Sequence, residues 1–195
     1  MEPASDLTLI ARLHDGDAAA FDAVHARFST PLFNFLARLS RRRDVAEDLL
    51  EETWLRLVTH ASALQADTRL GAWLFTVARN LYVSYCRSRL LEDAHASDLL
   101  GLWPSGCPLP SPFEQMAATE TERRVEAALA ALPVTSREAL LLVSVHGMSP
   151  SEAAGVCGLS PEAMRKRLSR ARAQMARHLD DSAVPRLTHL REVKT

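Results

Sequence analysis

The most constraining feature of the sequence is a short stretch in which no helix or strand can continue. Residues 101–112 contain four prolines and two glycines. Each proline removes a backbone N–H donor and fixes φ, and each glycine weakens a regular element. We therefore expect two separately folded parts, residues 1–91 and 122–181, joined by a flexible linker over residues 92–121 and followed by a C-terminal tail over residues 182–195.

The charge of the chain divides in the same places. The net charge is −1 overall, but residues 1–91 are neutral, residues 92–121 carry −5 with no basic residue, and residues 122–195 carry +4. A basic C-terminal part joined to a neutral N-terminal part by an acidic linker indicates that the charge of the surface is not uniform.

Apolar residues recur at helical spacing on both sides of the linker, and no strand-like alternation competes with them. The predicted fold is all-α: two small helical domains joined by a flexible acidic, proline-rich linker, the second ending in a helix-turn-helix. Pro31 is expected to begin a helix of its own, and Asp44 to cap the following helix with Glu47 as its capping-box partner. The expected helices cover residues 7–14, 21–28, 31–39, 44–60, 70–91, 125–132, 136–145, 150–156 and 160–178.

Composition excludes several classes of protein. The chain of 195 residues is 47% hydrophobic and 24% charged, as in soluble globular domains. No apolar run approaches the roughly 20 residues that span a bilayer, and no signal-peptide pattern is present, so we expect a cytoplasmic protein without membrane insertion.

Cys86, Cys107 and Cys157 form no CxxC pair and have no metal spacing with the histidines, so no disulfide framework or metal site is expected; redox activity of Cys107 is the alternative. No catalytic constellation and no cofactor motif is found, which predicts a non-enzyme.

The C-terminal part contains a strongly basic helix over residues 160–178. Ser160 can cap it and Pro161 fits its first position. Met164 and Leu168 belong to its apolar stripe, and the opposite side is charged; the stretch carries six basic residues and one acidic residue. Such a helix suits phosphate, although a solvated face is the plainer interpretation.

The residues before this helix favour DNA. Ser149 and Glu152 form a capping-box pattern with Pro150 between them, and Gly158 can supply the left-handed turn that ends a short helix. A short helix, a glycine-containing turn and a longer basic helix are typical of a helix-turn-helix, whose second helix enters the major groove.

Two helices of the N-terminal part also carry patterned charge. Residues 47–52 contain four acidic side chains. They form either a solvated helix face or a surface that docks on a basic partner. Residues 70–91 interleave arginines with aromatics and contain no acid, as single-stranded DNA requires. A tryptophan at helical spacing is, however, more often a core residue than a stacking platform for bases, and this core interpretation applies to Trp73.

Two stretches resemble the extracytoplasmic-function (ECF) sigma factors of bacterial RNA polymerase. DVAEDLLEETWLRL followed by LGAWLFTVARNLYVSYCRSR is similar to the conserved first domain of that family, and LPVTSREALLLVSVHGMSPSEAAGVCGLSPEAMRKRLSRAR is similar to its closing domain. The resemblance implies sigma region 2 over residues 1–91 and sigma region 4 over residues 122–181. It also implies three partners: the RNA polymerase core enzyme, promoter DNA as duplex and melted single strand, and an anti-sigma factor. The acidic linker would then pass through the channel of the polymerase.

The resemblance also implies three sets of site residues. Core-polymerase binding falls on Asp48, Glu51, Glu52 and Arg56. Recognition and opening of the -10 element fall on Arg69, Trp73, Arg79, Asn80, Arg87 and Arg89. Recognition of the -35 element falls on Arg165, Lys166, Ser169, Arg170 and Arg172.

The sequence departs from the family pattern at Glu51, Leu70, Ser84 and Ala153, so no promoter consensus is inferred from it. A helix-turn-helix repressor or activator with an N-terminal helical sensing domain is the alternative function, and a helical adaptor without a DNA role is a third. The acidic helix followed by the basic-aromatic helix favours the sigma factor over both.

Overall fold

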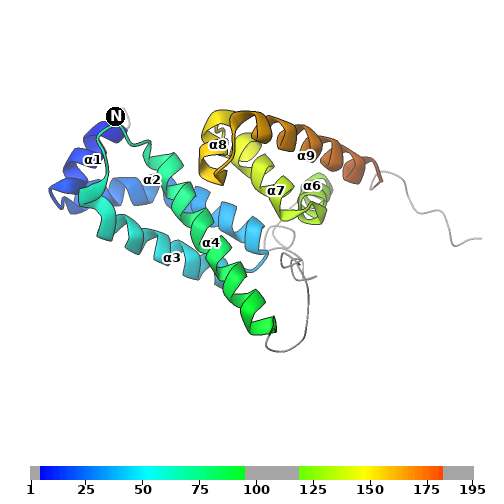
Figure 1. Ribbon diagram of the computed structural model, residues 1–195, viewed down its shortest axis with the longest axis horizontal. Helices are drawn as coiled ribbons and strands as arrows, with labels where there is room; N and C mark the ends of the chain where they lie inside the picture. The colour runs from blue at the N-terminus through cyan, green and yellow to red at the C-terminus, as the bar shows by residue number, and fades with distance from the viewer. Residues whose placement is uncertain (1–4, 95–118, 182–195) are drawn as a thin grey trace, which may run out of the picture.

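The computed structural model describes residues 5–94 and 119–181, and every regular element in these ranges is helical. The helices form two groups that lie against each other (Figure 1). The first group contains α1 (Asp6–His14), α2 (Ala18–Ser40), α3 (Arg43–His60), the 3-10 turn η1 (Ala61–Ala63) and α4 (Leu70–Ala94). The second contains α6 (Glu120–Ala131), α7 (Val134–Leu140), the π-helical segment η2 (Leu141–Val145), α8 (Pro150–Cys157) and α9 (Pro161–Asp181). The predicted all-α class is confirmed.

The core of the first group lies between α2, α3 and α4. Phe35 and Phe75 meet edge to face with ring centroids 5.2 Å apart, and Trp54 is buried from α3. The buried face of α4 is formed by Leu70, Leu74, Phe75, Ala78, Tyr82 and Cys86. The apolar spacing of the sequence predicts a buried stripe of Trp73, Leu74, Val77, Leu81 and Tyr85. The observed face is rotated from it, because Trp73, Leu81 and Tyr85 are only partly buried.

Helix α2 runs without interruption from Ala18 to Ser40, so the expectation that Pro31 begins a separate helix is wrong. A proline inside a helix removes one i→i−4 hydrogen bond. Phe28 and Leu32 on either side of it are both buried in the same core, and this packing keeps the two halves in one helix.

The expected start of α3 is also wrong. The helix begins at Arg43, its N-cap is Arg42, and no side chain caps it. Asp44 lies in the first turn and pairs with Arg42, while Glu47 pairs with Arg43. The two acids therefore bind neighbouring arginines and form no capping box.

The first turn of α4 is held by residues distant in sequence. Asp6 Oδ2 accepts a hydrogen bond of 3.0 Å from the backbone N–H of Leu70, the first residue of α4. A carboxylate at this position also complements the helix dipole. Gly71 follows, and a Cβ at this position would lie 3.2 Å from the ring of Phe28. Helices α2 and α4 approach closely because residue 71 has no side chain.

In the second group, α8 and α9 form the expected helix-turn-helix. Ser149 and Glu152 make both hydrogen bonds of the predicted capping box, and Gly158 adopts φ 65°, ψ 38° after α8. Ser160 Oγ accepts a hydrogen bond from the backbone N–H of Ala163 at the start of α9. These local signals are confirmed as predicted.

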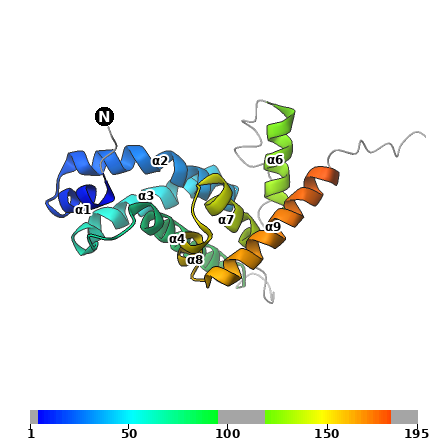
Figure 2. The ribbon, with the colours of Figure 1, turned by 90° about the horizontal axis from the view of Figure 1, so that it is seen from above.

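The two groups of helices pack together along α4 and α8, with a second contact between α2 and α7. Figure 2 shows α7 and α8 lying against α2 and α4, with α6 and the end of α9 pointing away. The expected linker and C-terminal tail fall largely outside the described residues. Within the described residues, no helix is long and apolar enough to cross a membrane.

Candidate nucleic-acid interface

A groove of about 440 Å³ runs between α3 and α4. It contains an arginine, a histidine, an indole and an amide beside small hydroxyls, which are groups that can stack on a base or donate to it. The residues that line it are Arg56, His60, Trp73, Thr76, Val77, Asn80, Leu81 and Ser84. These side chains are therefore of the kind that can stack on an unstacked base or hydrogen-bond to it.

The predicted -10 residues of α4 fall on two different sides of the helix. Trp73 and Asn80 face the groove, and helical spacing puts Arg87 on the same stripe. Arg69, the residue before α4, pairs instead with Glu152 of α8. Arg79 faces the second group of helices, where its Nε donates to Glu138 Oε1 at 2.8 Å. Arg89 is exposed and lies off the groove stripe.

Two aromatic residues of α4 behave differently from expectation. Helical spacing places Tyr82 off the apolar stripe that the sequence predicts to be buried, but this residue is 4% exposed, and its hydroxyl donates to the carbonyl of Leu39. Burial raises the pKa of this phenol. Trp73 packs against the core with one part and lines the groove with the other, so it is in part a core residue, and its predicted contact with DNA stays a prediction.

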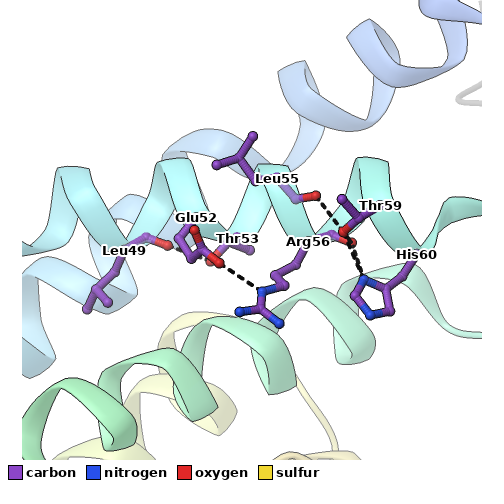
Figure 3. A network of polar contacts seen from close by, with 7 residues as sticks. All are labelled: Leu49, Glu52, Thr53, Leu55, Arg56, Thr59 and His60. Carbon is purple, nitrogen blue, oxygen red and sulfur yellow. Dashed lines mark hydrogen bonds and ion pairs between the residues drawn. The ribbon is translucent and has the colours of Figure 1, made fainter. Parts of the chain in front are cut away.

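The predicted docking residues on α3 also divide between two faces. Asp48 and Glu51 are exposed on an outer stripe. Arg56 does not belong to that stripe: it lines the groove and pairs through Nε with Glu52 Oε1 at 2.8 Å. Figure 3 shows Arg56 pointing toward α4, on the side away from Leu55. The structure thus brings Arg56 beside the -10 residues.

Apolar periodicity predicts that Leu55 and Val58 face inward on this helix, but they are 59% and 60% exposed. They continue the outer stripe of Asp48 and Glu51 at spacings of seven and ten residues from Asp48. Large exposed apolar side chains beside charged ones are typical of a protein-binding surface. We call Asp48, Glu51, Leu55 and Val58 the outer α3 face.

On α9 the two predicted faces are confirmed. Met164, Leu168 and Ala171 are buried, at 0%, 3% and 0% exposure. All five predicted -35 residues are exposed: Arg165, Lys166, Ser169, Arg170 and Arg172.

Lys166 and Arg170 also line a groove of about 480 Å³ between α9 and the start of α7. Thr135 and Ser136 form its other wall, and the hydroxyl of Ser136 donates to Gln174 Oε1 at 2.8 Å. Cations beside hydroxyls suit a phosphate of duplex DNA. Thr135 and Ser136, on the α7 side of this surface, were not predicted from the sequence as site residues.

One buried acid lies between the two candidate DNA surfaces. Glu138, 4% exposed, binds Arg79 through Oε1 and approaches Arg167 Nη1 to 3.5 Å through Oε2. Burial, with Glu138 nearby, raises the pKa of the Cys157 thiol to about 12. A thiol with this pKa is almost entirely protonated near neutral pH and therefore unreactive.

Cys107, the candidate redox residue, lies outside the described residues. Among residues 5–94 and 119–181, no cluster of three metal-binding side chains occurs.

His60, Thr76 and Ser84 line the α3–α4 groove but were not predicted as site residues. Helical spacing could have indicated Thr76 and Ser84, which lie on the stripe of Trp73 and Asn80. His60 ends α3, and the neighbourhood of α3 and α4 across the groove is a tertiary contact that spacing alone does not reveal.

The fold and these surfaces define a helical DNA-binding protein of the sigma-70 type. Residues 24–90 match the family described as Sigma-70 region 2, and residues 122–175 match Sigma-70, region 4. The first match covers α3, α4 and most of α2, and the second covers the helix-turn-helix.

Curated relatives and solved structures agree with these matches. The ECF RNA polymerase sigma factor EcfG of Rhodopseudomonas palustris (strain TIE-1) is 38% identical over 144 residues, 73% of this chain and 75% of that protein. The RNA polymerase sigma factor CarQ of Myxococcus xanthus is 33% identical over 159 residues, 82% of this chain and 88% of that protein. The structure of CnrH in complex with the cytosolic domain of CnrY has a TM-score of 0.68 at 26% identity, covering 91% of this chain and 99% of that one.

The sigma factor RpoE in complex with the anti-sigma factor NepR from Bartonella quintana has a TM-score of 0.65 at 26% identity, covering 82% of this chain and 96% of that one. The chain belongs to the ECF sigma factors of RNA polymerase. It is a regulatory protein that directs promoter-specific transcription initiation.

Proposed function

We propose that the work of initiation is divided among three surfaces of this chain. The α3–α4 groove binds the -10 element, the exposed face of α9 binds the -35 element, and the outer α3 face binds the core polymerase. The observation that carries the proposal is that one helix, α3, presents an acidic and apolar stripe on one side and one wall of a nucleotide-sized groove on the other.

The groove suits a strand that has left the duplex. Trp73 offers a partly exposed ring for stacking, and Asn80 offers an amide that can both donate to and accept from a base edge. Arg87 extends the same stripe toward the end of α4, and Arg69 lies just before its first turn; we propose that both meet the strand's phosphates. Arg56 lies on the opposite wall, so we assign it to the -10 strand in addition to the docking role that the resemblance implies.

The outer α3 face suits a protein partner. Asp48 and Glu51 supply charge that steers a basic surface, and Leu55 and Val58 supply apolar area to bury. Glu52 is held by Arg56 and stabilises the groove wall.

The face of α9 suits duplex DNA. Arg165, Ser169 and Arg172 lie on one stripe, and Lys166 and Arg170 lie on a second stripe that borders α7. We propose that the first stripe contacts base edges and that the second holds the backbone, since Thr135 and Ser136 offer hydroxyls beside it.

Control by an anti-sigma factor is part of the proposal. Among the similar structures, CnrH is in complex with the cytosolic domain of CnrY, and RpoE is in complex with the anti-sigma factor NepR. We propose a partner of this type here, with the chain acting in the cytoplasm, where the polymerase is. We also propose residues 1–91 as the region 2 domain, 92–121 as the linker, 122–181 as the region 4 domain and 182–195 as a tail.

Run-off transcription tests the proposal. Purified core polymerase with this protein and a library of promoter fragments is expected to give discrete transcripts that need the protein. The alternative, a helix-turn-helix regulator, predicts tight duplex binding by the free protein and no such transcript. Absence of any protein-dependent transcript across the library would overturn the proposed division of surfaces.

A further inference from the structure

Within the described residues, three ion pairs join one group of helices to the other, and in all three the charges are arranged in the same way. In each, the arginine belongs to the first group or to the residue before α4, and the glutamate belongs to the second group. Arg38 Nη2 lies 2.6 Å from Glu126 Oε1, Arg79 Nε lies 2.8 Å from Glu138 Oε1, and Arg69 pairs with Glu152. The second group thus contributes three carboxylates that bind arginines of the first, although residues 122–195 as a whole are basic and Arg137 of α7 also reaches across to the carbonyl of Arg38.

Two of these pairs are shielded from water. The side chains of Arg38 and Glu126 are 15% and 14% exposed, and that of Glu138 is 6% exposed against 20% for Arg79. Salt screens such pairs less than surface pairs, and removing one partner would leave a buried charge without compensation.

An apolar seam lies beside the ion pairs. The ring of His146, just after η2, packs against both Phe75 and Phe35, with centroids 4.7 Å and 5.9 Å away. Helix α8, whose Ala153 and Ala154 are buried, packs on α4. The closed arrangement therefore has both the apolar area and the charge complementarity of a specific interface.

Two of the three arginines held in this way are candidate -10 residues, Arg69 and Arg79. A carboxylate binds a guanidinium with the same planar fork geometry that a phosphate uses. Glu138 also approaches Arg167 on α9, so a single acid lies between a cation of the -10 helix and a cation of the -35 helix.

We propose that the second group of helices is an intramolecular competitor of nucleic acid. In the closed chain, Glu138 and Glu152 occupy the guanidinium groups of Arg79 and Arg69, and a DNA strand must displace these carboxylates to use both arginines. The inference rests on the proposed assignment of Arg69 and Arg79 to the -10 strand. A chain cannot be closed and bound to the strand at the same time. The apparent affinity for the strand is therefore the intrinsic affinity multiplied by the fraction of chains that are open.

The test uses the full chain with three charge-neutralising substitutions, Glu126→Gln, Glu138→Gln and Glu152→Gln. Glutamine keeps the shape of each side chain, and at position 152 it can still complete the capping box with Ser149. Removing three negative charges strengthens DNA binding by itself. The matched control therefore removes three exposed acids outside the interface, Asp22→Asn, Glu47→Gln and Glu120→Gln.

Two quantities are measured for both variants and the unaltered chain. Small-angle X-ray scattering gives the radius of gyration, and fluorescence anisotropy gives the Kd for a labelled single-stranded DNA of mixed sequence at fixed salt. We expect the interface variant to have a larger radius than the control and to bind the strand about tenfold more tightly, a change equivalent to about 1.4 kcal/mol.

Equal radii or equal affinities for the two variants would overturn the proposal. If the triple variant does not fold, Glu152→Gln alone is compared with Glu120→Gln, and equal affinities of these single variants would overturn it as well. The -10 assignment is tested separately by adding Arg69→Ala and Arg79→Ala to the interface variant. Unchanged affinity after these additions contradicts the proposed function of the arginines, whereas the radius still reports on closure.

Discussion

Arg137 Nη1, from α7, donates a hydrogen bond of 3.0 Å to the carbonyl oxygen of Arg38 in the last turn of α2. The same guanidinium, in a side chain only 3% exposed in total, donates to the carbonyls of Leu129, Ala130 and Leu132 around the end of α6. Helix C-termini leave carbonyls without partners and carry partial negative charge, so one buried cation satisfies the ends of two helices from different groups.

Replacing Arg137 by Met is expected to destabilise the fold strongly. The change leaves several carbonyl acceptors around the ends of α2 and α6 without their donor, at a cost on the order of 2–3 kcal/mol. Arg137→Lys keeps the charge but cannot donate in a fork, so it is expected to restore only part of the loss. Urea unfolding followed by circular dichroism measures both, with Arg123→Met, an exposed arginine of α6, as the control. A variant as stable as that control would contradict the capping role.

Leu55→Ser is expected to weaken binding to core polymerase about tenfold without lowering the stability of the free protein. The leucine is 59% exposed, so the fold loses little when it becomes polar, whereas an interface loses its buried area. Leu7→Ser is the matched control, because Leu7 is a leucine of α1 with 60% exposure. Affinity is measured by surface plasmon resonance on immobilised core enzyme, and equal loss in the two variants would remove the outer α3 face from the proposed interface.

Arg170→Ala is expected to reduce recognition of the upstream element while leaving core binding intact. The side chain lies on the groove between α9 and α7, where we propose that it holds the DNA backbone. Loss of a phosphate contact should weaken binding to all duplexes similarly and lower the salt slope of log Kd by about one. Arg123→Ala removes one exposed arginine outside this surface and is the control. A loss confined to one promoter sequence would instead assign Arg170 to base readout.

Acid is expected to weaken the fold through His146. Burial, and secondarily Arg38, lowers the pKa of this imidazole from 6.5 to about 4. Between these values the unfolded chain binds a proton that the folded chain does not, so this contribution to stability is fully present above pH 6.5 and is lost as the pH falls toward 4. Lowering the pH from 7 to 5 should cost up to about 2 kcal/mol of unfolding free energy through this group.

His146→Phe should remove that part of the pH dependence, because an aromatic ring still packs against Phe35 and Phe75 but no longer titrates. Thermal melts at both pH values measure the difference between the two proteins. An identical loss of melting temperature in both would show that His146 titrates normally in the folded state.

The helix-turn-helix could be predicted from the sequence because its signals are local. Ser149, Glu152, Gly158 and Ser160 act within a few residues of their own helix ends, and the structure confirms each of them. The exposed cations of α9 were predictable for the same reason, since helical spacing fixes which residues share a face.

The errors arise where tertiary contacts override local preference. Pro31 lies inside a helix because the residues before and after it are buried in one core. Leu55 and Val58 are apolar yet exposed, and their position could not be derived from hydrophobicity, which predicts burial for any leucine or valine. The contacts of Arg69, Arg79 and Arg38 with glutamates 59 to 88 residues away leave no trace in local spacing.

The hydrogen bond from the Leu70 N–H to Asp6 bears on how far the first group of helices is a self-contained unit. The match to Sigma-70 region 2 begins at residue 24, yet the first turn of α4 depends on a carboxylate 64 residues before it. A fragment cut at the family boundary would keep the groove residues of α4 but lose the contact that fixes where this helix starts. For this chain, α1 belongs to the smallest unit that can be transplanted or swapped between relatives without loosening the helix that carries Trp73 and Asn80.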